Sequence, residues 1–159
     1  MNKLYLLLGS NMGNSKQKLA EATKHIAKDV GKILRSSHLY QTAAWGKTDQ
    51  PDFLNQVIVV ETKLSAQQTI ISILAIEKKM GRVRIEKNAP RIIDIDILFF
   101  NKDIINEKDL IVPHPQLQNR RFVLVPLNEL SPRFIHPVSK KTIHYLLRVC
   151  PDKLPVNKI

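Results

Sequence analysis

The stretch PRIIDIDILFF, residues 90–100, combines a strongly apolar strand pattern with two aspartates, Asp94 and Asp96. Isoleucine and phenylalanine favour a buried β-strand. Because side chains alternate between the two faces of a strand, both aspartates face the same side. The opposite, apolar face takes Ile93, Ile95, Ile97 and Phe99. Carboxylates in such a strand cost free energy unless cationic groups meet them, so this pattern predicts cations nearby.

The two aspartates allow two interpretations. Their Cα atoms would lie about 6.5–7 Å apart, from a rise of about 3.3 Å per residue, and carboxylates so placed can converge on a pair of metal ions. Oxygen-only ligands favour magnesium or manganese over zinc. Alternatively, the aspartates are charges that discourage edge-to-edge strand pairing, or partners of structural arginines. The residues alone leave both interpretations open.

Arginines lie in the segment that leads into this strand, at positions 82, 84 and 91. Guanidinium groups suit phosphate oxygens because their forked geometry is bidentate and their charge does not titrate. An acidic metal site that faces arginines is what transfer between phosphates requires. Further along, His114 and Arg120 would supply a second phosphate-binding edge. The alternative is a solvated basic loop and a structural histidine.

The net charge of +11 and the pI near 9.9 indicate an anionic partner. A nucleotide, a nucleic acid and an anionic membrane all fit this charge, and so do lysines that merely solvate the surface. Low aromatic content, 6%, weakens RNA binding as the explanation.

The 159 residues suffice for one domain, which we expect to span residues 1–159. Cys150 is the single cysteine, which excludes an internal disulfide and fits a reducing compartment. No apolar run approaches membrane-spanning length, and the N-terminal run is shorter than a signal-peptide core. We therefore expect a cytoplasmic protein. That it is a monomer acting on small molecules, with neither nucleic acid nor membrane as a partner, is implied only by the family resemblance given below.

Several catalytic motifs are missing from the sequence. GSNMGN, residues 9–14, lacks the lysine and Ser/Thr of a P-loop and does not match G-x-G-x-x-G, so we expect it to form a strand-to-helix turn. No paired Cys/His spacing suits zinc, and no G-x-S-x-G suggests a covalent nucleophile.

Apolar periodicity predicts the order strand, helix, strand, strand, helix, strand. The predicted strands cover residues 3–11, 32–42, 53–62 and 90–100, and a small hairpin follows at 104–113. The first helix would begin with Ser15 as N-cap and stop at Gly31, and the second would begin with a Ser65–Gln68 capping box and stop at Gly81. Glu77 lies on the apolar stripe of the second helix and should need a cationic partner.

This order is that of an α+β, ferredoxin-like βαββαβ core, here with a C-terminal extension. Helices would cover one face of an antiparallel sheet, and the extension would add further cover. We expect the tail, residues 151–159, to be loosely ordered.

Several segments resemble those of the 6-hydroxymethyl-7,8-dihydropterin pyrophosphokinase family. They are LGSN (8–11), DQPDFLNQV (49–57), GRVR (81–84), PRIIDIDILFF (90–100) and VPHPQLQNRRFVLVPLNELSP (112–132). They occur in the family's order, and the resemblance covers nearly the whole chain. It implies transfer of the β,γ-diphosphate of ATP to the hydroxymethyl group of the pterin, with release of AMP, in folate biosynthesis.

The resemblance also implies roles for individual residues. Asp94 and Asp96 would ligate two magnesium ions, and Arg82 and Arg91 would act in catalysis. The residues implied to contact ATP are Arg82, Arg84, Arg91, Ile97, His114 and Arg120. Those implied to form the pterin pocket are Thr42, Ala43, Phe53, Asn55, Asp94 and Phe122.

The sequence departs from the family pattern in places, and one segment bears on the pterin. The segment EKNA, residues 86–89, stands where some members carry a tryptophan that closes over the pterin. We expect Trp45, in TAAWGK, to cover the pterin instead. The open alternatives are a basic ferredoxin-like RNA-binding module and a different magnesium-dependent phosphotransferase.

Overall fold

The computed structural model describes residues 1–43, 50–82 and 91–159. Its strands are β1 (Asn2–Ser10), β2 (Gly31–Ser36), β3 (Tyr40–Thr42), β4 (Phe53–Thr62), β5 (Asp94–Phe100), β6 (Ile105–Glu107), β7 (Leu110–Val112) and β8 (Asn157–Lys158). Its helices are α1 (Ser15–Asp29), α2 (Ala66–Lys79), the 3₁₀ helix η1 (Leu117–Asn119), α3 (Arg121–Leu130) and α4 (Ile143–Arg148).

The main sheet is antiparallel and runs in the order β5-β1-β4-β3-β8, with β2 also paired to β4. This arrangement confirms the predicted ferredoxin-like order. The predicted strand at 32–42 was wrong as one element, because the chain breaks into β2 and β3 at residues 37–39. The Ser37 hydroxyl accepts the Val57 N–H there at 3.0 Å and takes the place of a ladder partner.

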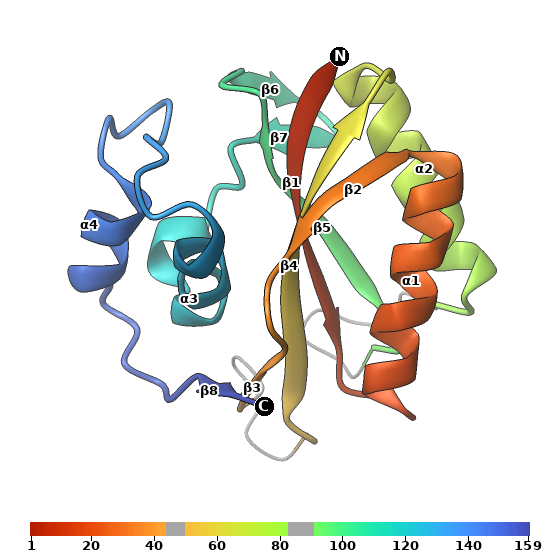
Figure 1. Cartoon of the computed structure of the whole chain (residues 1–159), viewed down its shortest axis with the longest axis horizontal. Coiled ribbons are helices and arrows are strands. Elements are labelled where there is room, and N and C mark those ends of the chain that lie inside the picture. Colours follow the sequence, from red (N-terminus) through yellow and green to blue (C-terminus); the bar gives the residue numbers. More distant parts are fainter. Residues whose placement is uncertain (44–49, 83–90) are drawn as a thin grey trace.

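Helices cover both faces of the sheet (Figure 1). On one face, α1 and α2 pack against alternate residues of β1, β4 and β5, such as Leu6, Ile58 and Ile95. On the other, α3 and α4 enclose a second cluster that includes Leu7 and Val57. The C-terminal extension thus supplies the second cover that the sequence predicted.

A β-bulge at the end of β5 corrects one predicted orientation. Tyr5 pairs with Phe99 but Leu6 pairs with Ile97, so Leu98 is an extra residue on β5. Ile97 therefore packs under α1 and α2, as predicted, whereas Phe99 joins the opposite cluster. Its ring meets Tyr5 edge-on, with centroids 5.8 Å apart. The alternating pattern could not show this extra residue because every residue there is apolar.

The helix ends follow the predicted signals with one shift. Asn14, not Ser15, caps α1, and its side chain accepts the Gln17 N–H. Ser65 and Gln68 form the predicted capping box at the start of α2. Gly81 follows α2 with φ +92°, a conformation that favours glycine after a helix.

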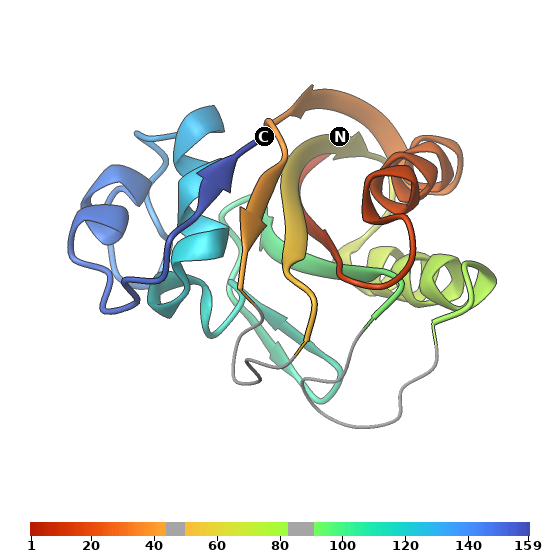
Figure 2. The ribbon, with the colours of Figure 1, turned by 90° about the horizontal axis from the view of Figure 1, so that it is seen from below.

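The C-terminal tail is more ordered than predicted. β8 pairs with β3 (Figure 2). The Ile159 N–H also donates to the Leu39 carbonyl at 3.0 Å. Earlier in the tail, buried Asp152 accepts the N–H groups of Arg121 and Leu154. Two prolines did not prevent order, because hydrogen bonds to β3 and α3 fix the segment. Among the described helices, none has the length and apolar character to cross a membrane.

Candidate functional site

Asp94 and Asp96 lie at the start of β5, beside the end of β1. Asp94 is paired with Gly9 and Asp96 with Leu7. Leu7 packs in the cluster under α3 and α4, so both carboxylates lie on that face of the sheet, as predicted. In the described sheet β5 is an edge strand. The alternative that the aspartates discourage edge-to-edge strand pairing is therefore also compatible with their position.

Two of the predicted arginines bind Asp94 directly. Arg82 Nη1 lies 2.7 Å from Asp94 Oδ1, and Arg91 Nη1 lies 3.0 Å from Asp94 Oδ2. Arg82 Nη1 also lies 2.6 Å from Glu77 Oε2, which accepts the Ile95 N–H at 2.8 Å. The cationic partner predicted for Glu77 is therefore confirmed. This network holds the end of α2 and the start of β5 together.

The charges at the site perturb one another. Burial, with the negative charges of Asp94 and Glu77, raises the pKa of Asp96 to about 7, against the opposing effect of Arg120 and Arg82. Burial alone would lower the pKa of Arg82, but Asp94 and Glu77 raise it above its usual value. Burial lowers the pKa of Arg120 despite its attraction to Asp96 and Asp94. An added cation beside Asp96 would relieve its unfavourable environment.

The donor set at Asp94 and Asp96 fits magnesium. Both residues offer hard carboxylate oxygens, which Mg²⁺ prefers. Over residues 1–43, 50–82 and 91–159, no three His, Cys, Asp or Glu side chains gather as a metal cluster. A two-carboxylate site suits Mg²⁺, which keeps waters and substrate phosphates among its ligands.

His114 follows β7, and its backbone N–H donates to the Leu98 carbonyl at 3.0 Å. Its Nδ1 accepts the Gln116 N–H at 3.1 Å. Burial and the nearby charge of Arg120 lower the pKa of His114 to about 4, although Asp94 opposes the shift. The ring is therefore neutral at pH 7 and, with Nδ1 as acceptor, carries its proton on Nε2 as a donor.

The residues predicted for the pterin pocket meet on the same sheet face. Asn55 is paired with Gly9, which in turn is paired with Asp94, so the three lie in one row across β4, β1 and β5. Thr42 is paired with Phe53 on the neighbouring row. Within the described parts of the chain, the buried Asn55 Nδ2 has no hydrogen-bond partner. That donor is available to a ligand lying over the row.

The backbone at Gly9 comes close to the side chains of its neighbours. A Cβ there would lie 2.9 Å from Asn55 Oδ1 and 3.8 Å from Phe53 Cδ1. The absence of a side chain leaves a flat surface between Asn55 and Asp94. Ala43, also predicted for this pocket, is exposed after β3.

Phe122 and Arg120 come to the site from the start of α3. The Arg120 guanidinium carbon lies 5.9 Å from the centroid of the Phe122 ring. Asp152 from the tail accepts the N–H of Arg121, between them. The C-terminal extension therefore helps to place two predicted site residues.

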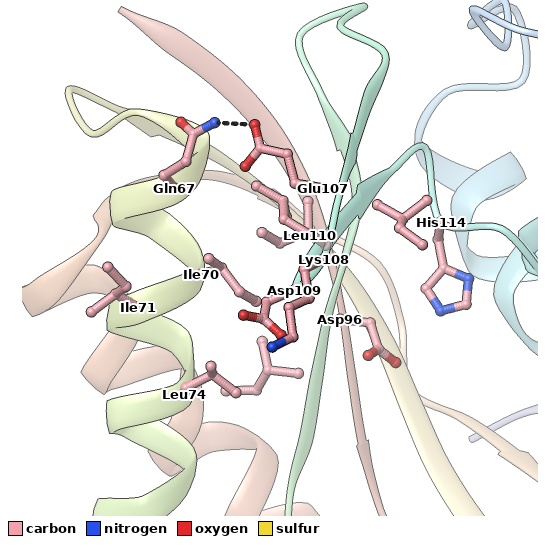
Figure 3. A pocket seen from close by; sticks show the side chains of 13 residues that line it. Gln67, Ile70, Ile71, Leu74, Asp96, Glu107, Lys108, Asp109, Leu110 and His114 are labelled. Atoms are coloured by element: carbon pink, nitrogen blue, oxygen red, sulfur yellow. Dashed lines mark hydrogen bonds between the residues drawn. The ribbon is translucent and has the colours of Figure 1, made fainter.

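A groove of about 730 Å³ leads away from the aspartates, between α2 and the β6–β7 hairpin (Figure 3). Gln67, Ile70, Ile71 and Leu74 line it from α2, and residues 107–111 line it from the hairpin. Asp96 and His114 lie at one end, and Ile97 also lines the groove, as its predicted role requires. At the outer rim, Gln67 Nε2 donates to Glu107 Oε2 at 3.1 Å.

The structure brings together some of the predicted site residues, and it contains others that were not predicted from the sequence. Arg84 and Trp45 lie outside the described residues, so their predicted roles stay predictions. Gly9 and Asn11 were assigned only to a turn, although LGSN was a family segment. Neither Ile70 nor Ile71 was predicted as a site residue, although both line the groove, because exposure on a helix depends on where the hairpin lies.

Comparison with known proteins places this site in a family. The family model of 7,8-dihydro-6-hydroxymethylpterin-pyrophosphokinase matches residues 5–132. The chain belongs to this family. The match covers both aspartates, the groove and the start of α3, and thus the whole site described above.

Curated relatives agree with this membership. The chain is 39% identical over 136 residues to the 2-amino-4-hydroxy-6-hydroxymethyldihydropteridine pyrophosphokinase of Methylorubrum extorquens, covering 85% of this chain and 86% of that protein. It is 38% identical to the protein of the same name from Aquifex aeolicus, with 90% and 89% covered. It also matches the folic acid synthesis protein fol1 of Pneumocystis carinii at 39% identity over 88% of this chain, but spans only 19% of that protein.

Solved structures of the family share the fold. A Plasmodium falciparum HPPK-DHPS triple-mutant crystal structure superposes with a TM-score of 0.76 and 23% identity over 92% of this chain. This chain spans 44% of that chain. At this identity the likeness shows the fold, which is the ferredoxin-like architecture expected from the sequence.

Proposed function

We propose that this chain transfers pyrophosphate from ATP to the hydroxymethyl group of 6-hydroxymethyl-7,8-dihydropterin, releasing AMP, in folate biosynthesis. Family membership supports this reaction. So do two relatives that are named as this pyrophosphokinase and that the chain matches over most of their length. The observation that carries the proposal is one continuous site: a groove that ends at paired carboxylates ringed by arginines, next to a flat polar row on the sheet.

The fold argues against the RNA-binding alternative. RNA-binding ferredoxin-like domains stack bases on an open sheet face. Here α3 and α4 cover the face opposite α1 and α2 (Figure 1). The remaining alternative is another magnesium-dependent phosphotransferase, which would cleave a different bond. The reaction products therefore distinguish the two.

The nucleotide would lie along the groove. Ile70, Ile71 and Leu74 give the apolar surface on which a purine base packs, with the hairpin opposite. The phosphates would then reach the end marked by Asp96 and His114. There Arg82, Arg91 and Arg120 supply permanent positive charge, and His114 offers its Nε2 proton to a phosphate oxygen.

Asp94 and Asp96 would hold the magnesium, and we propose two ions. Bound magnesium neutralises phosphate charge and lowers the cost of the charge that develops during transfer.

The pterin would lie over the row of Asn55, Gly9 and Asp94. Gly9 leaves room for a flat ring, and the unpartnered Asn55 Nδ2 can donate to a ring acceptor. Phe53 and Phe122 offer aromatic faces for stacking, and Thr42 and Ala43 border the pocket.

The chemistry needs no covalent enzyme intermediate. The pterin hydroxyl oxygen forms a bond to the β-phosphorus, and the bond from the β-phosphorus to the bridging α,β-oxygen breaks. That oxygen leaves with its electron pair on AMP, and the hydroxyl proton is released. The arginines stabilise the negative charge on the transferred group, and positioning supplies most of the remaining rate.

The test is an assay with ATP, magnesium and the hydroxymethyl dihydropterin, in which the nucleotide product is identified. AMP that forms only when the pterin is present supports the proposal, and ADP or orthophosphate in its place contradicts it. Asp94→Ala and Asp96→Ala should each remove most activity and still fold. Asp103→Ala, at an exposed position in the turn after β5, is the matched control and should remain active. Full activity of either site variant would rule out the proposed metal role.

A further inference from the structure

Asn11 lies directly after β1 and is buried, with 3% of its surface exposed. Its backbone N–H donates to the Arg91 carbonyl at 3.1 Å, and its Oδ1 accepts the Arg91 N–H at 2.9 Å. Its Nδ2 donates to Gln50 Oε1 at 3.0 Å and to the Pro51 carbonyl at 3.1 Å. One buried residue thus makes four hydrogen bonds to two segments that are distant in the sequence.

The first two bonds fix the Arg91 backbone through both its carbonyl and its N–H group. The Arg91 side chain starts from that fixed point and reaches Asp94 Oδ2 at 3.0 Å. The second pair of bonds holds residues 50–51, which lead into Phe53 at the start of β4. Asn11 therefore connects the backbone of Arg91, which we assign to the phosphates, with the segment that leads into Phe53, which we assign to the pterin.

Asn101 provides a built-in comparison at the opposite end of the same strand pair. Its backbone N–H donates to the Lys3 carbonyl at 2.7 Å, and its Oδ1 accepts the Lys3 N–H at 2.9 Å. The same two-bond exchange therefore closes both ends of the β1–β5 pair. At Asn101 it holds Lys3, which has no place in the site, so the exchange alone is a way to end a strand. The Nδ2 of Asn101 donates to Asn2 Oδ1 at 2.9 Å, also away from the site. Asn11 differs in holding Arg91 and in donating its Nδ2 to residues 50 and 51.

We propose that Asn11 is a positioning residue for the transfer reaction, which sets the Arg91 guanidinium relative to the Asp94 carboxylate. This inference rests on the proposed function, because Arg91 matters to turnover only if phosphates bind beside Asp94. Asn11 itself touches no reacting atom; it acts through Arg91. Displacement of a charged group by roughly 1 Å can cost about 100-fold in rate, so the loss of this support should lower kcat more than it raises KM.

The test is a double-mutant cycle on the full chain, with kcat and KM measured from AMP release. The variants are Asn11→Ala, Arg91→Ala and the double variant, and Asn101→Ala is the matched control. We expect Asn11→Ala to lower kcat about 10- to 100-fold. The double variant should be no slower than Arg91→Ala alone, because the two residues act as one unit. Asn101→Ala should lower the melting temperature and leave kcat within about twofold of the wild-type value, although its φ of +51° makes alanine strained there.

Two results would overturn the inference in an active enzyme. One is a double variant whose kcat falls by the product of the two single losses, and the other is a kcat of Asn11→Ala equal to that of Asn101→Ala. Asn11→Asp keeps an acceptor opposite the Arg91 N–H and should retain more kcat than Asn11→Ala; equal loss would also contradict the inference. If the wild-type protein releases no AMP, the proposed function itself fails, which is a different result from additivity in an active enzyme.

Discussion

At the scale of single residues, the site depends on what is absent at position 9 as much as on the charges around it. Gly9 lies between Asn55 and Asp94 on neighbouring strands, and any Cβ would meet Asn55 Oδ1 at 2.9 Å. Contacts under 3.0 Å require the neighbour to move. A side chain at residue 9 would therefore displace the Asn55 amide from the flat row that we assign to the pterin.

Gly9→Ala should weaken pterin binding selectively. The added methyl displaces the Asn55 amide, and an overpacking cost of about 1–3 kcal/mol carried into pterin binding corresponds to a loss of about 5- to 150-fold in affinity. Titration calorimetry with the pterin and, separately, with a non-hydrolysable ATP analogue measures both affinities, and the second should change less than about twofold. Gly13→Ala is the control: its φ of +70° costs about 1 kcal/mol of stability, but a Cβ there meets nothing within 4 Å. Unchanged pterin affinity in Gly9→Ala would contradict the placement of the pterin over this row.

The residues that the sequence predicted best were those whose chemistry conflicts with their setting. Asp94 and Asp96 in an apolar strand, and Glu77 on an apolar stripe, each implied a cation, and Arg82 meets two of the three. Asn11 carried no such conflict, because asparagine is ordinary in a turn. Its role depends on bonds to residues 50, 51 and 91, which local sequence does not encode.

At the scale of elements, the start of α3 depends on the chain's C-terminal tail. Arg120 is the N-cap residue, and its donor-only side chain cannot accept the free N–H groups of the first turn. Asp152 supplies the acceptor instead: its Oδ2 accepts the Arg121 N–H at 3.0 Å, and its Oδ1 accepts the Leu154 N–H at 3.0 Å. A carboxylate at a helix N-terminus is also favoured by the helix dipole.

Asp152→Ala should lower the free energy of unfolding by about 1–2 kcal/mol, the usual cost of a lost cap. It should also raise KM, because Arg120 and Phe122 flank the residue that Asp152 holds. Urea denaturation and steady-state kinetics measure the two effects. Asp152→Asn keeps an acceptor oxygen and should lose less stability than alanine. A tail that is merely loose would show no change in either variant.

Element prediction was most successful where the signals were local. The capping box of α2 and the extent of β4 follow from side chains within a few positions of each other. The bulge at Leu98 and the pairing of β8 with β3 do not, because both are set by long-range register. The prolines of the tail argued for disorder, and distant hydrogen bonds outweighed them.

At the scale of the whole molecule, the sheet is held between two helical layers, and the outer segment at residues 134–142 is fixed to it by a buried histidine. His136 is 6% exposed, and its ring lies edge-on to Phe99 of β5 with centroids 5.6 Å apart. Its Nδ1 accepts the N–H groups of Val138 and Ser139 at 3.1 and 3.2 Å. Burial lowers the pKa of His136, so the folded protein holds it neutral.

This histidine makes the protein sensitive to acid. Its folded pKa lies below the unfolded value of about 6.5, so its contribution is fully present above pH 6.5 and is lost as the pH falls through the folded pKa. The free energy of unfolding should therefore decrease on acidification below pH 6.5, by at most about 1.4 kcal/mol per pH unit from this one proton. His136→Asn should show a shallower decrease in urea titrations from pH 7.5 to pH 5.5. An identical slope in the variant would show that His136 does not control this behaviour.

The proposed transfer of two phosphates in one step differs from the reaction of ordinary kinases, and labelled ATP tests it directly. The enzyme is given ATP that is radiolabelled at either the α- or the γ-phosphate, together with magnesium and the hydroxymethyl dihydropterin, and the products are separated. The γ-label should appear in the pterin product and the α-label in AMP, in equal amounts. The Asp96→Ala variant should form neither labelled product. If the α-label is recovered in ADP, or the γ-label in free orthophosphate, the chain is not a pyrophosphokinase.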